Sequence, residues 1–408
     1  MRHRIVVLGA GYAGAFAAGN LARRLNAEDI EITVVNAAPD FVERMRLHQL
    51  ASGHQVGFRP LADMFAGTGV RVRVARVTGL DPERRTVAVS GADGDAELAY
   101  DTLLFTLGSA VDRHGVPGVA EYAFDVTGLP SALRLRDRLA ALGAGGTVLV
   151  VGEGLTGIET AAEIAEARPD LAVALAARGE LGAWLSPKAG RHLRASFARL
   201  GITVHEHTGI EAVEPGRAIA ADGRALPAEV TVWTAGFAVN PLAALSGLEL
   251  AADGRILVDG TMRSVSHPDV YVAGDCAHAT GVNGRPLPMS CASAGLTAGQ
   301  ATAAIVARLT GREATVSGLK YFGNHISLGQ RDALVQMVDG AERSKSWFLG
   351  GRTAVRFKAS VLKASAWTIA HPTYGLPRRK HHLTAVPART PGQNAGQNPA
   401  QGPVRSAA

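Results

Sequence analysis

The chain has 408 residues, of which 47% are hydrophobic and 19% are charged. These ordinary proportions exclude intrinsic disorder along the whole chain, and at roughly 150 residues per domain the length allows two or three domains. The two cysteines, Cys276 and Cys291, are too few for a disulfide-stapled scaffold or a four-cysteine zinc site. The net charge of +6 is a modest basic excess that fits anionic lipid or nucleic acid without identifying either.

Residues 1–19 at the N-terminus allow two interpretations. Their basic start and apolar middle resemble a secretory signal. The other interpretation is a strand from Arg4 to Leu8 that enters a glycine-rich turn and a helix. We favour the strand, because only this interpretation gives the glycines that follow Leu8 a role. No uninterrupted apolar stretch reaches the roughly 18 residues that a membrane-spanning helix needs, so we expect a soluble protein or one bound at a membrane surface.

Short β-branched runs alternate with alanine- and leucine-rich helical stretches along the chain. Further predicted strands are Ile30–Val35, Leu103–Thr106, Val148–Val151, Ala172–Leu175, Val230–Trp233 and Val270–Ala273. Nearly continuous apolarity is typical of strands buried on both faces, as in a parallel sheet covered by helices. We therefore predict a doubly wound α/β fold. Residues 383–408, rich in Pro, Gly, Gln and Asn and without periodicity, are predicted to be a disordered tail.

Two glycine fingerprints of the form GxGxxG each follow a predicted strand and open a predicted helix. Their glycines are Gly9, Gly11 and Gly14 in the first copy and Gly152, Gly154 and Gly157 in the second. The helices are expected to extend through Leu25 and Ala167. In each copy the first glycine permits a tight turn, the second lets the backbone approach a pyrophosphate, and the third lets the helix pack on the strand. The helix N-terminus then offers free N–H groups to the phosphates. Two copies predict two bound dinucleotides.

Roughly twenty residues after each fingerprint, the end of a strand should carry an acid for the 2′-hydroxyl of the adenosine ribose. Neither place has one. The first has Asn36, which can hydrogen-bond a ribose but carries no charge. At the second, the strand ends in Ala176-Ala177-Arg178, and an arginine without an acid favours a 2′-phosphate and hence NADPH. The alternative, that Arg178 is an ordinary solvated loop residue, stays open.

A third motif, Gly274-Asp275, closes the predicted strand Val270–Ala273 and puts a carboxylate at the carboxyl edge of a sheet. It resembles the Gly-Asp motif of the two-dinucleotide flavoproteins, whose aspartate bonds the ribityl chain and phosphate region of the flavin. Two further segments, 104–109 with Gly108 and 232–236 with Gly236, resemble the crossover motifs of that superfamily. The motifs stand in the order that the superfamily has, which implies an FAD domain with an inserted NAD(P)H domain.

Disulfide reductases of this superfamily need a redox dithiol near the flavin. Residues 1–275 contain no cysteine, and the two cysteines present are too far apart in sequence for a CxxC pair. Residues 41–53, 157–159 and 326–333 resemble segments of the type II NADH dehydrogenases, and this likeness extends from residue 1 to about residue 380. It implies direct electron transfer from the flavin to a quinone, with Glu159 near the nicotinamide and the flavin.

The resemblance, together with the strand-end positions of Asn36 and Arg178, assigns binding residues beyond the six glycines of the fingerprints. For FAD they are Asn36, Arg44, Val77, Gly108, Gly274, Asp275, Cys291 and Ala292. For NAD(P)H they are Arg178 and Gly236. One departure leaves the acceptor open: the family usually opens the helix against the flavin with Ala-Gln, whereas residues 288–293 read Pro-Met-Ser-Cys-Ala-Ser. That helix can still stabilise negative charge on the flavin. Cys291 is interpreted as a small buried hydrophobe, with a redox role as the alternative.

Residues 341–382 hold nine Lys or Arg and one acid, Glu342. Residues 352–370 have helical periodicity that separates two faces. The basic face has Arg352, Arg356 and Lys363. The broad apolar face has Ala354, Phe357, Val361, Leu362 and Ile369. With Trp367, such a helix can lie in the headgroup layer of an anionic membrane. The alternative is that the apolar face packs on the protein's own core. Nucleic acid is not expected, because no aromatic side chains interleave with the charges.

We therefore predict an FAD-binding domain of residues 1–112 and 236–315, an NAD(P)H-binding domain of residues 113–235, and a C-terminal interface segment of residues 316–382. The predicted activity is hydride transfer from NAD(P)H to FAD and electron transfer on to a quinone-like acceptor, in the cytoplasm or at the inner face of the cell membrane. Glu159 would orient the nicotinamide or gate its approach. No metal site is expected, and a homodimer is left open. The alternatives are an FAD-dependent oxidase or dehydrogenase of a specialised small molecule, a ferredoxin reductase, and a non-enzymatic flavin-binding sensor.

Overall fold

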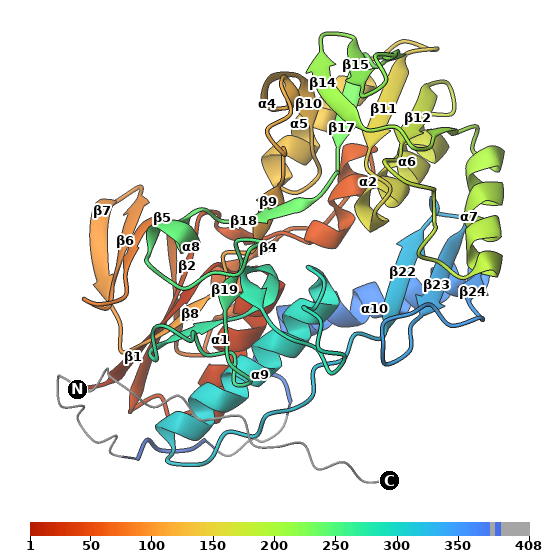
Figure 1. Cartoon of the computed structure of the whole chain (residues 1–408). Coiled ribbons are helices and arrows are strands. Elements are labelled where there is room, and N and C mark those ends of the chain that lie inside the picture. Colours follow the sequence, from red (N-terminus) through yellow and green to blue (C-terminus); the bar gives the residue numbers. More distant parts are fainter. Residues whose placement is uncertain (376–379, 385–408) are drawn as a thin grey trace.

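Two parallel sheets covered by helices form the frame of the protein (Figure 1). The computed structural model describes residues 1–375 and 380–384. The doubly wound α/β class that the sequence predicts is confirmed. All seven predicted strands are present, with ends within one residue of those expected.

The larger sheet has the strand order β20-β8-β1-β2-β5-β6-β7. Its first five strands are parallel, and β6 and β7 extend it as antiparallel strands. The strands are β1 His3–Leu8, β2 Ile30–Asn36, β5 Val70–Asp81, β6 Thr86–Gly91, β7 Gly94–Ala99, β8 Thr102–Phe105 and β20 Val270–Val272. The helices α1 (Tyr12–Arg24) and α9 (Cys291–Leu309) pack side by side on this sheet (Figure 1). Because β1 is an interior strand, the strand interpretation of the N-terminus is confirmed.

The smaller sheet has the order β10-β17-β11-β12-β13, and all its strands are parallel. The strands are β10 Ala123–Phe124, β11 Thr147–Val151, β12 Ala172–Ala176, β13 Thr203–His205 and β17 Val230–Trp233. One hydrophobic cluster joins it to α5 (Leu129–Ala140), α6 (Leu155–Ala167) and α7 (Pro187–Arg199). A second cluster joins it to the antiparallel sheet of β14 (Ile210–Glu214), β15 (Arg217–Ala220) and β16 (Ala225–Pro227). The sheet is therefore covered on both faces, which explains its nearly continuous apolar strands.

Two antiparallel strands carry the chain between the sheets. They are β9 (Ser109–Val111) and β18 (Phe237–Val239), paired so that Ala110 faces Ala238. These strands follow the two crossover motifs directly. We propose the expected limits, residues 112/113 and 235/236, as the borders of the inserted unit.

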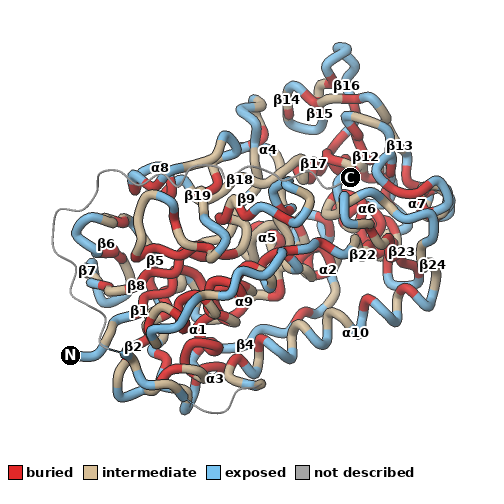
Figure 2. Tube along the Cα trace, turned by 60° about the horizontal axis from the view of Figure 1, so that its bottom comes forward, coloured by how far each residue is buried: buried red, intermediate tan, exposed pale blue. Residues whose placement is uncertain are grey.

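The C-terminal segment contributes an antiparallel sheet and a long helix. The sheet consists of β22 (Gly323–Ser327), β23 (Ala333–Met337) and β24 (Leu349–Gly350), and α10 (Gly351–Ala370) follows it. The helix packs on this sheet and on α1, so it connects the C-terminal sheet to a helix that covers the larger parallel sheet (Figure 1). Figure 2 shows the strands of the parallel sheets largely buried, whereas most residues along α10 are exposed or intermediate and only Ala354, Lys358 and Ile369 are buried.

Short elements complete the chain. They are β3 Asp40–Phe41, η1 Arg44–Arg46, α2 Leu47–Ala51, β4 Arg59–Pro60, α3 Leu61–Met64, α4 Val119–Tyr122, α8 Leu242–Leu245, β19 Ile256–Leu257, η2 Gly274–Cys276 and β21 Ala277–His278.

The prediction of a disordered tail from residue 383 onward starts too early. The N–H of Leu383 donates to the carboxylate of Asp29 (3.0 Å), and the N–H of Thr384 donates to the carbonyl of Leu309 (3.0 Å). These residues are held because His381 forms a β-bridge with Leu25, which brings the chain back onto the larger sheet's helices. Residues 385–408 of the predicted tail lie outside the described residues.

Candidate active site

A cavity of about 1040 Å³ lies between the carboxyl ends of the two parallel sheets. Residues that follow β1, β2, β8 and β20 line it from the larger sheet, and residues that follow β11, β12 and β17 line it from the smaller one. The inner face of α10 closes a further side. Ligands of open α/β sheets bind at this edge, and the volume is at the upper end of the range for single-ligand pockets. The cavity therefore has room for more than one group.

The cavity brings together most of the residues that the sequence predicts. Those lining it are Gly11, Asn36, Arg44, Gly108, Gly152, Gly154, Glu159, Arg178, Gly236, Gly274, Asp275, Cys291 and Ala292. Gly9, Gly14 and Gly157 do not line it but shape its walls, as described below. Val77 lies outside it. This residue belongs to the part of β5 that continues past the pairing of Asn36 with Val74 and pairs with Val89 of β6.

The first fingerprint owes its shape to close contact with a crossover motif. Gly9 has φ +91°, and a Cβ there would lie 2.5 Å from the carbonyl oxygen of Thr106. A Cβ on Gly14 would lie 1.9 Å from the carbonyl oxygen of Gly9 and 2.5 Å from Oγ1 of Thr106. The Thr106 hydroxyl donates to the carbonyl of Leu8 (2.7 Å). The first and third glycines thus let the loop, the helix and Thr106 meet without side chains between them.

The second fingerprint repeats this arrangement. Gly152 has φ +117°, and a Cβ there would meet the backbone of Thr234 at 2.9 Å. A Cβ on Gly157 would lie 1.8 Å from the carbonyl oxygen of Gly152 and 2.7 Å from Oγ1 of Thr234. The Thr234 hydroxyl donates to the carbonyl of Val151 (2.7 Å). Each crossover threonine therefore fastens its own glycine-rich loop to the preceding strand.

Both fingerprint helices begin at the cavity with free backbone donors. The N-cap residues are Gly11 for α1 and Gly154 for α6, and neither helix has a side-chain cap or an acid in its first turn. A Cβ on Gly11 or Gly154 would meet nothing within 4 Å. Uncapped N–H groups next to open space form a site for an anion such as a pyrophosphate.

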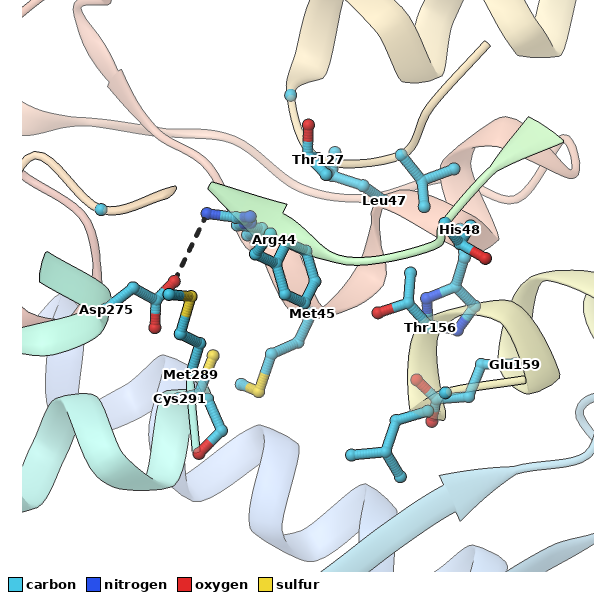
Figure 3. Close-up of a pocket in the computed structure, with 18 of the residues that line it drawn as sticks. Arg44, Met45, Leu47, His48, Thr127, Thr156, Glu159, Asp275, Met289 and Cys291 are labelled. Carbon is cyan, nitrogen blue, oxygen red and sulfur yellow. Dashed lines mark ion pairs between the residues drawn. The ribbon is translucent and has the colours of Figure 1, made fainter. Parts of the chain in front are cut away.

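A polar cluster lines the cavity on the side of the larger sheet. Arg44 donates to the carbonyl oxygen of Ser109 (2.8 Å) and pairs with Asp275 at 3.8 Å (Figure 3). The Ser109 hydroxyl donates to Asp275 Oδ2 (2.6 Å). Asn36 accepts from the N–H of Ala10 (2.9 Å), so its amide holds the glycine-rich loop in place. Asp275 therefore lies at the sheet edge, as the Gly-Asp motif predicts, with a cation beside it.

The two thiols differ in burial and position but share the same protonation state. Cys276 is buried and donates to the carbonyl of Gly108 (3.1 Å), whereas Cys291 is half-buried and begins α9 at the cavity. Burial raises the pKa of the Cys291 thiol to about 12, with Asp275 adding to the effect, and burial raises the pKa of Cys276 as well. Both thiols are therefore protonated at neutral pH, which favours the interpretation of Cys291 as a small hydrophobe.

Glu159 meets Lys358 at the other end of the cavity. The two side chains, from α6 and α10, form an ion pair, and both are largely buried. Lys358 also donates to the carbonyl of His325 (3.2 Å), and Glu159 accepts from the N–H of Ser327 (2.9 Å). Burial alone would raise the pKa of Glu159, but the charge of Lys358 and the hydrogen bonds that Glu159 accepts from Lys358 and Ser327 outweigh it and lower the pKa below its ordinary value.

His48 of α2 lies near Glu159 (Figure 3). Burial lowers its pKa to about 4, so the imidazole is neutral at neutral pH. Its Nε2 is buried and has no hydrogen-bond partner among the residues that the structure describes, and the side chain lines the cavity. A buried polar atom without a partner costs free energy, and a ligand in the cavity would satisfy it.

Sequence reasoning missed His48 and Lys358 as residues of the site. Lys358 was counted among the basic residues of the C-terminal stretch, but the structure buries it. At 100° per residue it falls within the apolar face of α10, between Ala354 and Leu362. A single cation inside an apolar stripe was therefore the available signal.

Comparison with known proteins identifies the family. Residues 3–298 match the family described as pyridine nucleotide-disulphide oxidoreductase. The chain belongs to this family. It is 33% identical over 316 residues to an NADH dehydrogenase-like protein of Mycobacterium tuberculosis, a match that covers 71% of this chain and 76% of that protein. It is 27% identical over 365 residues to the type II NADH:quinone oxidoreductase of Staphylococcus epidermidis, covering 82% and 89%.

A solved structure of NDH2 from Plasmodium falciparum, in complex with NADH, shares the fold. Its TM-score is 0.75 at 15% identity, over 93% of this chain and 100% of that one. The likeness to the type II NADH dehydrogenases and the expectation of a flavoprotein oxidoreductase that uses FAD and a nicotinamide dinucleotide are confirmed.

The cavity fits these two groups. Each needs a pyrophosphate site, and the uncapped starts of α1 and α6 provide two. Asp275 supplies acceptor oxygens for a polyol at the larger sheet. His48 Nε2 supplies a buried polar atom that has no partner within the described part of the chain. The pyridine nucleotide-disulphide oxidoreductase fold thus presents two nucleotide sites that face one common space.

Proposed function

We propose that the chain catalyses electron transfer from NADH to a quinone. FAD supplies the redox chemistry, because it can accept a hydride from a nicotinamide and release two electrons to an acceptor. The name of the Staphylococcus epidermidis relative, a type II NADH:quinone oxidoreductase, supports this acceptor. The observation that carries the proposal is the single cavity into which both fingerprints open.

The residues divide into two binding groups. At the larger sheet, Gly11, the first turn of α1, Arg44 and Asp275 would hold FAD, with the start of α9 beside it. At the smaller sheet, Gly154 and the first turn of α6 would hold the pyrophosphate of NADH. Because these groups face each other across the cavity, binding both ligands orders them for transfer.

An apolar wall of the same cavity suits the third reactant. Val361 and Leu362 of α10 line it together with Met289. Such side chains contact a quinone ring without competing for hydrogen bonds. Lys358, which also lines the cavity, is a cation that can donate a hydrogen bond or a proton to a quinone oxygen. Glu159 keeps this ammonium in place.

The transfer we propose uses no dithiol. The two cysteines of the sequence are both free, and burial keeps both protonated. Electrons would then pass directly to the acceptor.

The outer face of α10 suits contact with an anionic membrane. Arg352, Arg356 and Lys363 are exposed, and Phe357 and Trp367 keep 43% and 45% of their surface exposed. Basic and aromatic side chains together are typical of helices that lie in the headgroup layer. None of the helices in residues 1–375 and 380–384 is long and apolar enough to cross a membrane. We propose a peripheral attachment at the inner face of the cell membrane through this helix.

An anaerobic stopped-flow experiment tests the redox proposal. NADH is expected to bleach the visible absorbance of the purified holoprotein, and menadione is expected to restore it. Bleaching no faster than slow background reduction would overturn the first half-reaction. Reoxidation by a ferredoxin in a salt-sensitive reaction, with none by menadione, would instead point to a ferredoxin reductase, since salt screens protein docking.

Co-sedimentation with vesicles tests the attachment. The holoprotein is expected to bind vesicles that contain anionic lipid and not neutral ones, and the variant Arg352→Glu/Arg356→Glu is expected to lose this binding. Equal binding by the variant would contradict the proposed role of α10.

A further inference from the structure

We propose that Glu153 selects NADH over NADPH by accepting a hydrogen bond from the 2′-hydroxyl of the adenosine ribose. The inference rests on the proposed binding of NADH at the smaller sheet, and it assigns the specificity of that site to one residue.

Glu153 reaches away from its own loop. It stands between Gly152 and Gly154 in the second fingerprint, yet its carboxylate lies at the end of β12. Oε2 accepts from the N–H of Arg178 (3.1 Å), and Oε1 accepts from the N–H of Gly179 (3.1 Å). Both Glu153 and Arg178 line the cavity. The two bonds fix the position of the carboxylate.

This position is the one that a ribose-binding acid takes in a dinucleotide domain. There, an acid at the end of the second strand bonds the 2′-hydroxyl. In the smaller sheet β11 and β12 are the first and second strands of the strand–helix–strand unit around α6, and Val151 pairs with Ala176 where they end. Residues 176–178 offer no acid, which is why the sequence alone favoured NADPH. The structure supplies the missing carboxylate from the glycine-rich loop.

The chemistry of the carboxylate favours a hydroxyl over a phosphate. An ionised carboxylate has about four acceptor sites, and its two backbone hydrogen bonds leave capacity for a ribose hydroxyl. A 2′-phosphate in the same place is an anion next to an anion. The N–H groups of Arg178 and Gly179, which would otherwise bind that phosphate, already donate to Glu153.

Arg178 is the residue that favours NADPH, because its guanidinium could bind a 2′-phosphate. Its side chain is exposed, so its attraction for a phosphate acts through water and is screened by salt. Glu153 is half-buried and held by two hydrogen bonds. We expect the fixed carboxylate to outweigh the exposed guanidinium.

Calorimetric titration of the oxidised, FAD-loaded protein tests the inference without turnover or an acceptor. Wild-type protein is expected to bind NAD⁺ at least about tenfold more tightly than NADP⁺, and 2′-deoxy-NAD⁺ about tenfold more weakly than NAD⁺, as for a hydrogen bond to a charged group. In Glu153→Gln, which keeps the shape and removes the charge, the preference for NAD⁺ is expected to fall about tenfold, chiefly through tighter binding of NADP⁺.

Glu180→Gln is the matched control. Glu180 follows Arg178 by two residues, and its carboxylate pairs with Arg194 (3.0 Å) outside the cavity lining. Its removal changes the net charge equally and is expected to keep the NAD⁺ preference within about twofold, since exposed charges are screened.

Two results would overturn the inference: equal affinity of wild-type protein for NAD⁺ and NADP⁺, or equal effects of the two variants on the preference. If Glu153→Gln does not fold, the wild-type comparison of NAD⁺ with 2′-deoxy-NAD⁺ decides, because equal affinities there also refute it. Tight NAD⁺ binding by a protein that menadione cannot reoxidise would refute the proposed acceptor and leave this inference standing.

Discussion

Glu159 of α6 and Lys358 of α10 form a buried ion pair between side chains 199 residues apart in the sequence. The pair joins the smaller sheet to the C-terminal helix at the wall of the cavity. Because Lys358 lowers the pKa of a carboxyl group that burial alone would raise, Glu159 is ionised at neutral pH. Removing either side chain would leave the charge of the other buried without its partner.

Lys358→Ala is expected to lower the free energy of unfolding by about 3 kcal/mol at neutral pH, because it leaves Glu159 as an uncompensated buried charge. The deficit is expected to shrink as the pH falls toward about 4.3, the ordinary pKa of a glutamate. In wild-type protein, the lowered pKa gives stability that is lost as the pH falls through the folded value. In the variant, the charge of Lys358 is gone while the Ser327 N–H still opposes burial, so the pKa of Glu159 rises and its carboxyl group takes up a proton as the pH falls. Urea unfolding at several pH values measures both effects.

Lys363→Ala serves as the control, since Lys363 is on the same helix but exposed. Its expected change is within about 0.5 kcal/mol. Equal destabilisation by the two variants would show that the pair contributes nothing specific.

Alanine substitutions at two glycines of the second fingerprint are expected to have different effects, one on stability and the other on nucleotide binding. Gly157→Ala puts a Cβ 1.8 Å from the carbonyl oxygen of Gly152, so the loop and α6 must move apart. The expected cost is about 3 kcal/mol of stability, the upper end for overpacking. Gly154→Ala meets nothing within 4 Å and keeps a negative φ of −73°. It should leave stability nearly unchanged and weaken NADH binding, because the methyl group occupies the approach of the pyrophosphate.

Thermal unfolding and nucleotide titration on both variants check this contrast. Gly11→Ala and Gly14→Ala offer the same comparison at the first fingerprint, where the Gly14 Cβ would lie 1.9 Å from the Gly9 oxygen. A stable Gly157→Ala protein would contradict the packing described for both loops.

Glu163, one turn after Glu159 on α6, is expected to make stability fall as pH rises. Burial raises its pKa, although Gln330 and His54 oppose the shift, and His54 Nε2 lies 2.9 Å from its carboxylate. A folded state with a raised pKa holds its proton more tightly than the unfolded state, so the contribution is present below about pH 4.3 and is lost as the pH rises through the folded value. Glu163→Gln removes this titration and should gain stability relative to wild type over that interval.

Unfolding free energies measured from acidic to neutral pH test the sign. Glu180→Gln, an exposed carboxylate, is expected to leave the slope unchanged. If the Glu163→Gln curve stays parallel to the wild-type curve, the buried carboxyl group does not titrate as described.

Cys291→Ala is expected to retain NADH oxidation with menadione within about twofold, because a thiol with a pKa of about 12 supplies no thiolate at neutral pH. Native protein should also react slowly with iodoacetamide at both cysteines, and denatured protein quickly. Loss of activity in Cys291→Ala, with FAD still bound, would restore the redox role of this residue.

The glycine-rich loops were predictable because their chemistry is local. A strand, a glycine spacing and a helix occupy adjacent residues, and Gly9 and Gly152 adopt the positive φ that their spacing requires. The crossover motifs were also found as patterns, although only the structure shows that Thr106 and Thr234 contact these glycines.

Residues that depend on side-chain direction were not predictable. The residue between two fingerprint glycines is free in the pattern, so nothing marked Glu153 as the carboxylate that reaches β12. Lys358 stood among many cations, and its partner came from a distant helix. Val77 was assigned to FAD, but β5 extends beyond the cavity before it reaches this residue.

The C-terminal segment braces the two nucleotide-binding halves. Its helix α10 packs on β23 near one sheet and on α1 near the other, and Gly19 of α1 leaves no room for a Cβ against the backbone of Pro372, 2.2 Å away. The bridge between Leu25 and His381 then ties the chain back to α1. A hinge motion that widened the space between the sheets would have to pull this brace off one half. These contacts therefore oppose any motion that separates the two halves.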